Sequence, residues 1–373
     1  MPVPLIDLTR NQAQLAEIEA AVVRVVRSGH YILGPEVEKL EQELADYLGC
    51  RHALTMSSGT DALLAPMMAL GIGPGDEVVL PTYSFFATAG TVARTGARPV
   101  FVDSEPTFKN IDPELLDAAL KRCANPKAVV GVHLFGAAFD VDAVVRICRE
   151  HSVPLIEDAA QAIGTRHQGR MMGGHGLCAG WSTFPTKNFG GLGDGGFLTT
   201  EDTEFYEQCK LLRNHGMAQQ YLHHTIGGNF RMDALQAAAL RVKLRSMEEV
   251  TEQRRQNAEN YRRLFADADL LEWAELPTDT DRHAYHQFVL HVPEGERDAA
   301  IQHLRQQGIG CAVYYPVPFH RQPCFAHLAQ DAADFPVAEE ASRRSLAIPI
   351  FQGLTEAEQV DVVGALRHFV HDR

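Results

Sequence analysis

This sequence has little of what nucleic-acid-binding and membrane proteins need. Of its 373 residues, 34 are Lys or Arg and 48 are Asp or Glu, which leaves a formal net charge of −14. Because phosphate backbones are bound by basic surfaces, this excess of acidic residues argues against nucleic acid as a partner. The chain also has no apolar run of about 18 residues, the length that a membrane-spanning helix needs, so we expect no membrane span.

Cysteine is scarce and follows no pattern. The seven cysteines are an odd number, lie far apart and include no Cys-x-x-Cys pair. This spacing argues against a disulfide framework and a zinc site, and it predicts buried thiols in a reducing compartment. The first residues, MPVPLIDLTRNQAQ, have neither the basic nor the apolar part of a signal peptide. We therefore expect a cytoplasmic protein without a bound metal.

Alternating apolar patterns predict the fold. Short apolar runs at residues 77–81, 98–103, 128–135 and 154–158 are typical of buried strands, and a helical pattern at 140–150 separates the last two. Near-continuous apolar strands that alternate with helices indicate an α/β protein, with a mostly parallel sheet covered by helices on both faces. Active sites of such sheets lie beyond the carboxyl ends of the strands.

Helical patterns flank this region. Two helices are predicted near the N-terminus, one ending at Gly29 and the other at Gly49. A long helical pattern over residues 233–265 is interpreted as the connection between two domains. The part that follows mixes short strands with helices, which indicates a smaller α+β domain. We therefore divide the chain into a large domain, residues 1–245, and a small C-terminal domain, residues 246–373.

The segment Trp181–Thr200 holds the strongest candidate for chemistry. Lys187 follows a β-prone stretch and precedes a loop with five glycines between residues 190 and 196. Glycines let a backbone fold closely around a ligand, and a partly desolvated lysine beside such a loop suits imine formation with a carbonyl. A solvated surface lysine is the competing interpretation. A Walker A loop is excluded, because that motif places its lysine after the glycines.

Two polar residues follow the predicted strand at 154–158. Asp158 ends this strand and Gln161 lies one turn later. A carboxylate at the end of a buried strand is costly unless a cation pairs with it, and a protonated pyridine nitrogen is such a cation. The alternative is an aspartate that caps the following helix.

Two further segments complete the set of candidates. Residues 57–60, Ser-Ser-Gly-Thr, precede a helical run, where amides and hydroxyls form an anion site. Helix capping is the commoner role of such residues. Phe85 follows the strand at 77–81 and is placed to stack on a planar ring, although core packing is the usual role of phenylalanine.

Together these segments supply an amine for an imine, a carboxylate for a ring nitrogen, an anion site and a stacking aromatic. Few cofactors need all four, and pyridoxal 5′-phosphate (PLP) is one that does. We therefore predict that Lys187, Asp158, Phe85 and residues 57–60 surround PLP.

At these residues the sequence resembles the DegT/DnrJ/StrS family of sugar-nucleotide aminotransferases, which have the PLP fold-type I architecture of aspartate aminotransferase. The similarity runs along nearly the whole chain. The segments that carry it are YILGPEVEKLEQELADYLG (31–49), SSGTDAL (57–63), GIGPGDEVVLPTYSFFAT (71–88), VFVDSEPTFKNID (100–112), IEDAAQAIG (156–164), STFPTKNFGGLGDGG (182–196), NFRMDALQAAALRVKL (229–244), YYPVPFHRQP (314–323) and FPVAEEASRRSLAIPIF (335–351).

The resemblance implies a role for each matching residue. Lys187 stands where the family carries the cofactor as a Schiff base, and Asp158 stands where it pairs with the pyridine nitrogen. Gln161 matches a contact of the cofactor's 3′-oxygen, and Phe85 matches the ring-stacking position. The phosphate contacts match Gly59, Thr60 and Ser182. Asn229 matches a residue that reaches the phosphate from the neighbouring subunit, which implies a homodimer with shared active sites.

The resemblance also implies the reaction, which is transfer of an amino group from L-glutamate to a nucleotide-linked keto-sugar. The loop KNFGGLGDGG, residues 187–196, differs from the TTGEGG version of many 4-aminating relatives and favours a 3-keto over a 4-keto sugar. Both dTDP and UDP stay open as the nucleotide. Tyr31, Tyr314 and His320 are the expected sugar contacts, although many members carry His where Tyr314 stands. Amino sugars of this kind enter O-antigen, capsule, other glycans or antibiotics.

Two other functions belong to the same fold. A PLP-dependent sugar dehydratase carries His in place of the lysine, so Lys187 argues against it. A non-catalytic regulator is expected to have lost site residues, whereas this sequence keeps them. Ala137, Ile163 and Thr183 depart from the family's usual residues but leave the named cofactor contacts unchanged.

Overall fold

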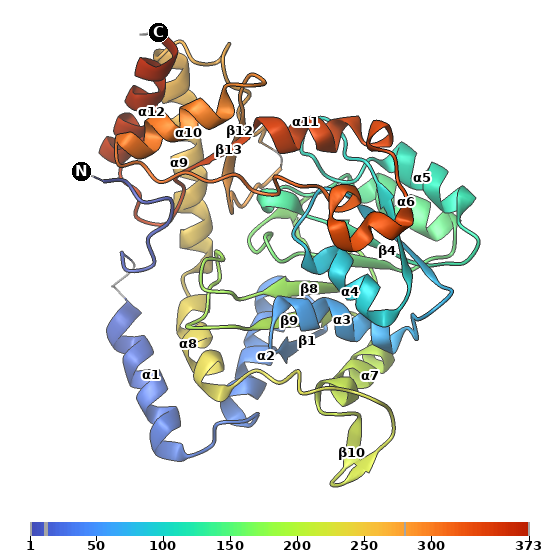
Figure 1. Cartoon of the computed structure of the whole chain (residues 1–373). Helices are drawn as coiled ribbons and strands as arrows, with labels where there is room; N and C mark the ends of the chain where they lie inside the picture. The colour runs from blue at the N-terminus through green and yellow to red at the C-terminus, as the bar shows by residue number, and fades with distance from the viewer. Residues whose placement is uncertain (1, 11–13, 280, 372–373) are drawn as a thin grey trace.

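A seven-stranded sheet lies at the centre of the computed structural model, which describes residues 2–10, 14–279 and 281–371 (Figure 1). In spatial order its strands are β1 (His52–Met56), β9 (Gly196–Thr200), β8 (Cys178–Ser182), β5 (Leu155–Asp158), β4 (Pro126–Val132), β2 (Glu77–Pro81) and β3 (Arg98–Val102). Only β9 runs antiparallel to its neighbours within this sheet. The prediction of a mostly parallel α/β sheet is therefore confirmed.

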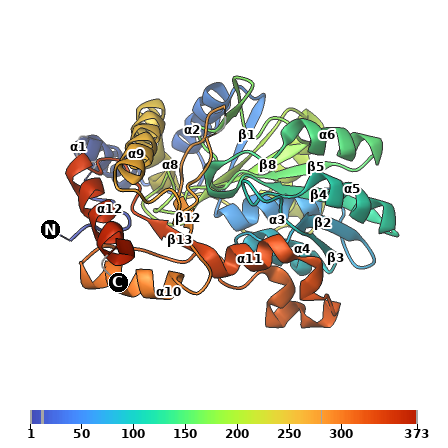
Figure 2. The same cartoon turned by 90° about the horizontal axis from the view of Figure 1, so that it is seen from above.

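Helices cover both faces of this sheet, because successive strand residues point to opposite sides. On β2, Val79 joins one buried cluster, while Val78 and Leu80 join the other. The first cluster packs under α2 (Pro35–Leu48), α5 (Pro113–Arg122), α6 (Val141–Glu150) and α8 (Ala234–Leu244). The second packs against α3 (Gly59–Ala69), α4 (Ala87–Thr95) and α7 (Thr203–Arg213). Figure 2 shows α2, α5 and α6 on one side of the sheet and α3 and α4 on the other.

Polar caps and glycines set the helix limits. Asp112 accepts backbone N–H bonds at the start of α5, and Asp140 does the same for α6. The predicted helix ends at Gly29 and Gly49 are observed: these glycines close α1 (Leu15–Ser28) and α2 with φ of 69° and 67°. The predicted strand at 128–135 ends earlier, at Val132, because the chain turns into a short 3₁₀ segment in which Phe135 has a φ of 56°.

The C-terminal part is built on a second, smaller sheet. Strands β12 (Phe288–His291) and β13 (Ser345–Ile348) pair antiparallel, and they pack with helices α9 (Met247–Asp267), α10 (Arg297–Gln306) and α12 (Glu356–His371) around a separate apolar cluster. Helix α11 (Pro336–Arg344) precedes β13. The remaining short elements are β6 (Arg166–His167), β7 (Arg170–Met171), β10 (Met217–Gln219), β11 (Leu222–His223), η2 (Leu134–Gly136), η3 (Phe319–Arg321), η4 (Pro323–Leu328) and η5 (Ala332–Asp334).

The single long helix predicted over residues 233–265 is wrong, since the structure has two helices there. Helix α8 ends before Ser246, and α9 begins immediately after it. The Ser246 hydroxyl donates to the Lys243 carbonyl at 3.1 Å, which gives that carbonyl a partner outside the α-helical pattern. The boundary predicted between residues 245 and 246 falls at this break and stays a prediction.

Residues 2–10 contact the C-terminal part, although the domain prediction places them in the large domain. Val3 pairs with both Gly308 and Gly310, at N···O distances of 3.0 and 2.7 Å. Arg10 forms an ion pair with Glu358 at 2.7 Å. We call residues 2–10 the N-terminal arm.

A buried arginine, Arg213, links helices α7 and α2 to strand β1 of the large sheet. Arg213, at the end of α7, is 6% exposed. It forms an ion pair with Glu41 of α2 and donates to the Thr55 carbonyl of β1 at 3.2 Å. The Thr55 hydroxyl also donates to Glu41, at 2.7 Å.

We expect Arg213→Met to lower the free energy of unfolding by about 3 kcal/mol, because the Glu41 carboxylate would lose its buried cationic partner. Urea denaturation measures this change. Arg149→Met is the matched control, since Arg149 is exposed on α6, and it should shift the value by less than about 0.5 kcal/mol. Equal destabilisation by both variants would contradict the expectation.

Candidate active site

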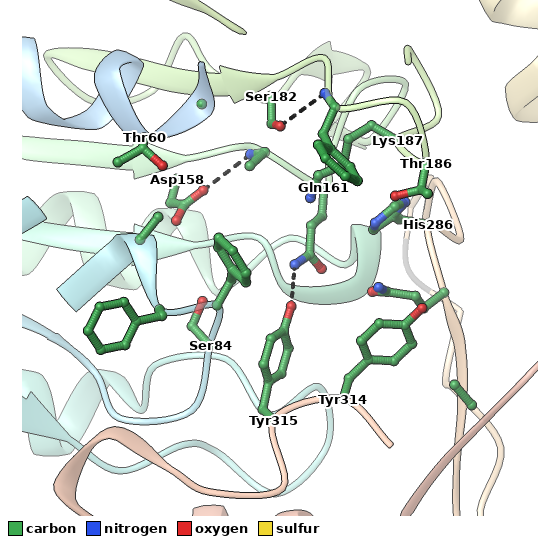
Figure 3. Close-up of a pocket in the computed structure, with 18 of the residues that line it drawn as sticks. Thr60, Ser84, Asp158, Gln161, Ser182, Thr186, Lys187, His286, Tyr314 and Tyr315 are labelled. Atoms are coloured by element: carbon green, nitrogen blue, oxygen red, sulfur yellow. Dashed lines mark hydrogen bonds between the residues drawn. The ribbon is translucent and has the colours of Figure 1, made fainter. Parts of the chain in front are cut away.

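The candidate residues meet at the carboxyl edge of the large sheet. Strands β1, β2, β5 and β8 run in the same direction, so the segments that follow them converge. There they line a cavity of about 750 Å³ together with residues of the C-terminal part. Figure 3 shows Lys187, Asp158, Thr60 and Ser182 directed toward this space.

Lys187 follows β8 and is held by a tight turn. Its backbone N–H donates to the Phe184 carbonyl at 2.8 Å, and its partly exposed side chain lines the cavity. Burial among protein atoms lowers the pKa of the Lys187 amine to about 8, against the opposing effect of the Asp158 carboxylate. The neutral fraction of this amine at neutral pH is therefore much larger than that of an ordinary lysine, and the neutral form is the one that attacks a carbonyl.

Asp158 is the buried acid of the site. Its side chain accepts the Thr88 hydroxyl at 2.7 Å and the Ala160 backbone N–H at 3.2 Å. Burial nevertheless raises the pKa of Asp158, and the hydrogen bonds and the Lys187 charge only partly oppose this effect. A cation placed against the carboxylate would lower its pKa again.

The anion site at the start of α3 depends on a close approach between two backbone segments. A Cβ atom on Gly59 would lie 2.7 Å from the Ser182 Cβ, so only glycine lets β8 come this near. The Ser58 side chain caps α3 by accepting the Asp61 N–H at 3.1 Å. Ser58, Gly59, Thr60 and Ser182 all line the cavity. Free N–H groups at a helix N-terminus favour a phosphate.

Gln161 links the sheet to the C-terminal part. Its side-chain oxygen accepts the Phe135 N–H at 2.7 Å, and its side-chain amide donates to the Tyr315 hydroxyl at 2.7 Å.

Phe85 is 57% exposed and lines the cavity, where it is free to contact a ligand ring. Tyr314 also lines the cavity.

Three expected residues lie outside the cavity lining of this chain. Asn229 forms an isolated bridge with Asn214. Tyr31 is 45% exposed, and its hydroxyl donates to the Val26 carbonyl. His320 is buried, and its two ring nitrogens lie 2.8 Å from Thr82 and from Glu339. This imidazole therefore has its polar partners within the protein.

Several lining residues were missed by the sequence analysis. They are Leu5, Ile6, Ser84, Thr186, Asp194, His286, Gln287 and Tyr315. Tyr315 lies beside Tyr314 in a family-like segment, which was a usable signal. His286 belongs to no motif, and its ring nitrogen lies 3.2 Å from the Asn188 side-chain oxygen. Burial, with the Lys187 and Arg254 charges, holds the pKa of His286 well below its usual value, so this ring is neutral.

This donor set fits PLP. The Lys187 amine matches its aldehyde, the buried Asp158 carboxylate with its raised pKa matches a protonated ring nitrogen, and the close approach at Gly59 matches its phosphate.

Among the described residues no group of three or more His, Cys, Asp or Glu side chains is placed to hold a metal ion. In the same part of the chain, no helix is long and apolar enough to cross a membrane.

The lowered pKa of Lys187 predicts how the cofactor-free protein reacts with an amine-labelling reagent. We expect its labelling rate, followed by peptide mass spectrometry, to rise and reach a plateau with a midpoint near pH 8. Asp158→Asn should move the midpoint lower, because the carboxylate stabilises the ammonium form. A midpoint near the ordinary lysine value of about 10.4 would contradict the proposed burial effect.

Comparison with known proteins agrees with this geometry. The model of the DegT/DnrJ/EryC1/StrS aminotransferase family matches residues 12–367. The chain is 42% identical to the pleiotropic regulatory protein of Geobacillus stearothermophilus, over 99% of both chains. It is 38% identical to the dTDP-3-amino-3,4,6-trideoxy-alpha-D-glucose transaminase of Streptomyces venezuelae, over 98% of this chain and 96% of that protein.

A UDP-sugar enzyme and a solved structure are also similar. The UDP-N-acetyl-3-dehydro-alpha-D-glucosamine 3-aminotransferase of Acidithiobacillus ferrooxidans is 37% identical over 99% of this chain and 98% of that protein. The crystal structure of S. venezuelae DesV with a ketimine intermediate superposes with a TM-score of 0.94, at 37% identity over 99% of both chains. The chain therefore belongs to the DegT/DnrJ/EryC1/StrS aminotransferase family and is a PLP-dependent transaminase.

Proposed function

We propose that this enzyme transfers the amino group of L-glutamate to the keto group of a nucleotide-linked 3-keto-sugar. The observation that carries the proposal is that one cavity of about 750 Å³ is lined by both Lys187, a lysine with a lowered pKa, and the buried Asp158. A cavity of this size holds a cofactor and leaves room for a sugar ring. Two relatives named for dTDP- and UDP-linked 3-amino sugars support the position of amination, and both nucleotides stay candidates.

The proposed roles follow from the positions of the side chains. PLP, when bound, supplies an electron sink for the bond that breaks at the substrate carbon. Asp158 keeps the ring nitrogen protonated, since a buried carboxylate is stable only beside a positive charge. The Lys187 amine removes a proton from the amino donor and returns a proton to the sugar carbon. Gly59, Thr60 and Ser182 would hold the phosphate at the start of α3.

A homodimer with shared sites is part of the proposal. The β10–β11 hairpin projects from the body of the chain (Figure 1), with one large apolar side chain exposed in its turn and another exposed just after β11. Tyr221 is 85% exposed and Ile226 is 88% exposed. A partner that covers these side chains would bring Asn229, at the base of the same segment, toward a second active site.

We place the enzyme in the cytoplasm, where its amino sugar would enter O-antigen or another glycan.

Two alternatives are weaker. A sugar dehydratase of this fold is disfavoured because Lys187 is present. A non-catalytic regulator is supported by the name of one relative, the pleiotropic regulatory protein. That alternative gives no reason to keep Lys187, Asp158 and the anion site together in a cavity.

Lys187→Ala should abolish transamination, since both proton transfers need the amine. The purified wild type should show the absorbance band of lysine-bound PLP and should lose that band when L-glutamate is added. The variant should show neither this band nor its loss. Lys243→Ala is the control: this lysine donates to the Gly190 carbonyl of the glycine loop but does not line the cavity, and its variant should keep the band. Turnover by Lys187→Ala would rule out the proposed roles.

Shared sites predict complementation between two inactive variants. We expect Lys187→Ala and Asn229→Asp to be inactive alone and to regain roughly one quarter of wild-type activity when refolded together. Random pairing makes half of the dimers mixed, and each mixed dimer has one intact site of two. Absence of recovery in demonstrably mixed dimers would place Asn229 and Lys187 in the same subunit's site or outside it.

A further inference from the structure

Asp158 receives one hydrogen bond that its own segment does not supply. Its Oδ1 atom accepts the Ala160 backbone N–H at 3.2 Å, a contact made only two residues along the chain. Its Oδ2 atom accepts the Thr88 hydroxyl at 2.7 Å, and Thr88 belongs to helix α4, 70 residues away in the sequence. Among the described residues, Thr88 is the one side chain that donates to this carboxylate. This contact therefore ties the orientation of Asp158 to a separate element of the fold.

A second threonine of α4 shows that the Thr88 contact is not the ordinary behaviour of a helical threonine. A threonine inside a helix commonly turns its hydroxyl back to a carbonyl one turn earlier. Thr91 does so, since its hydroxyl donates to the Ala87 carbonyl at 2.8 Å. Thr88 and Thr91 are both fully buried, yet Thr88 directs its hydroxyl across to the end of strand β5. The Thr88 hydroxyl is therefore committed to Asp158 rather than to its own helix.

A second hydroxyl orients the first. The Ser84 Oγ atom lies 3.1 Å from the Thr88 Oγ1 atom, at a distance where either hydroxyl could donate. A hydroxyl has one proton, and an ionised carboxylate can only accept. When Asp158 is ionised, the Thr88 proton is used for its carboxylate, so Ser84 is the donor to Thr88. The hydrogen bonds therefore run in one direction, from Ser84 through Thr88 to Asp158. We call Ser84 and Thr88 the hydroxyl pair.

The hydroxyl pair stabilises the charged form of Asp158. Burial raises the pKa of this carboxyl, and the Thr88 hydrogen bond is the largest of the effects that oppose the rise, followed by the Ala160 N–H and the charges of Lys187 and His133. Donation from Ser84 strengthens the Thr88 bond, because hydrogen bonds in a chain polarise one another. Tyr315 also interacts with Asp158, but burial raises the pKa of its hydroxyl, so it stays neutral.

The backbone of α4 acts in the same direction. Thr88 is the second residue of this helix, so the carboxylate that it contacts lies beside the first helical turn. The N-terminus of a helix favours a nearby anion. The hydroxyl pair and the helix end therefore both support a negative charge on Asp158.

We propose that Thr88, oriented by Ser84, is a positioning residue for transamination, which holds the Asp158 carboxylate charged and directed at the ring nitrogen of PLP. This inference rests on the proposed function, and in particular on the proposed role of Asp158. A carboxylate that loses this donor takes the proton of the ring nitrogen more readily. The substrate carbon then loses its proton more slowly, since the electron sink depends on a protonated ring nitrogen.

The protonation of the ring nitrogen is the most direct readout, and it does not depend on turnover. We expect the ring signal of holoenzyme made with 15N-labelled PLP to shift in Thr88→Val from the pyridinium position toward that of neutral pyridine. Thr91→Val is the matched control, because it places the same residue on the same buried helix, where the native hydroxyl donates only within α4. Its signal should stay at the wild-type position. A wild-type signal in Thr88→Val, or an equal shift in Thr91→Val, would overturn the inference.

Two further variants separate the hydroxyl from the shape of the side chain. Thr88→Ser keeps the donor and should keep the pyridinium signal. Ser84→Ala keeps Thr88 but removes its orienting donor, so it should shift the signal in the same direction as Thr88→Val and by a smaller amount. A full shift in Thr88→Ser would assign the effect to packing and contradict the positioning role. An unchanged signal in Ser84→Ala would contradict the part of the inference that concerns Ser84.

The kinetic constants should divide in the same way. We expect kcat of Thr88→Val to fall about 10- to 100-fold, the range for one hydrogen bond to a charged group, and Thr88→Ser to restore most of it. KM for L-glutamate should change less than about 3-fold, because the lost contact is to Asp158 and not to the amino donor. A raised KM with an unchanged kcat would be incompatible with the inference.

Asp158→Ala is the reference that separates this inference from the proposed function. If Asp158→Ala keeps the pyridinium signal and the wild-type kcat, the proposed role of Asp158 fails. If Asp158→Ala loses both while Thr88→Val loses neither, that role stands and the inference about the hydroxyl pair fails.

Discussion

The active site depends on one carboxylate that the protein buries without balancing its charge. Strand β5 ends with two acids that point to opposite faces of the sheet, and both are almost completely buried. Glu157 accepts N–H groups from Gly173, His175 and Gly176 and contacts His133. Burial alone would raise its pKa, yet these partners lower the pKa of Glu157 to about 2. Asp158 has only two donors, and its pKa stays raised. Glu157 therefore stabilises the fold, whereas the Asp158 carboxylate remains available to pair with a cationic ligand.

Parallel strands explain how distant segments reach this carboxylate. A right-handed crossover through a helix brings successive parallel strands back to the same edge, so the loops after the parallel strands open on one side. The two most demanding contacts are made at that edge. Gly59 must lack a side chain for β8 to approach, and the loop after β8 must turn sharply for Lys187 to point inward. The C-terminal part then closes the opposite side of the cavity.

Local patterns predicted four of the seven strands of the sheet, and they indicated the candidate cofactor residues. Apolar runs predicted β2, β3, β4 and β5, and Asp158 and Lys187 were proposed as site residues because they adjoin apolar or β-prone segments. Contacts that depend on packing between distant segments had no such signal. His286 and the arm were missed for this reason, and the break at Ser246 was missed because serine is compatible with a helix interior. His320 matched a family segment, but the structure gives its ring nitrogens partners in Thr82 and Glu339.

The contacts of the N-terminal arm also constrain the order in which parts of the chain can fold. Its anchors lie at opposite ends of the sequence, since the Arg10 contacts reach residues 353 and 358. Contacts between such distant segments close a very long loop and form late. During synthesis, residues 2–10 leave the ribosome long before Gly310 and Glu358 exist to receive them. The large sheet can therefore assemble its lysine and its anion site first, and the cavity acquires its last wall only when translation has passed residue 358.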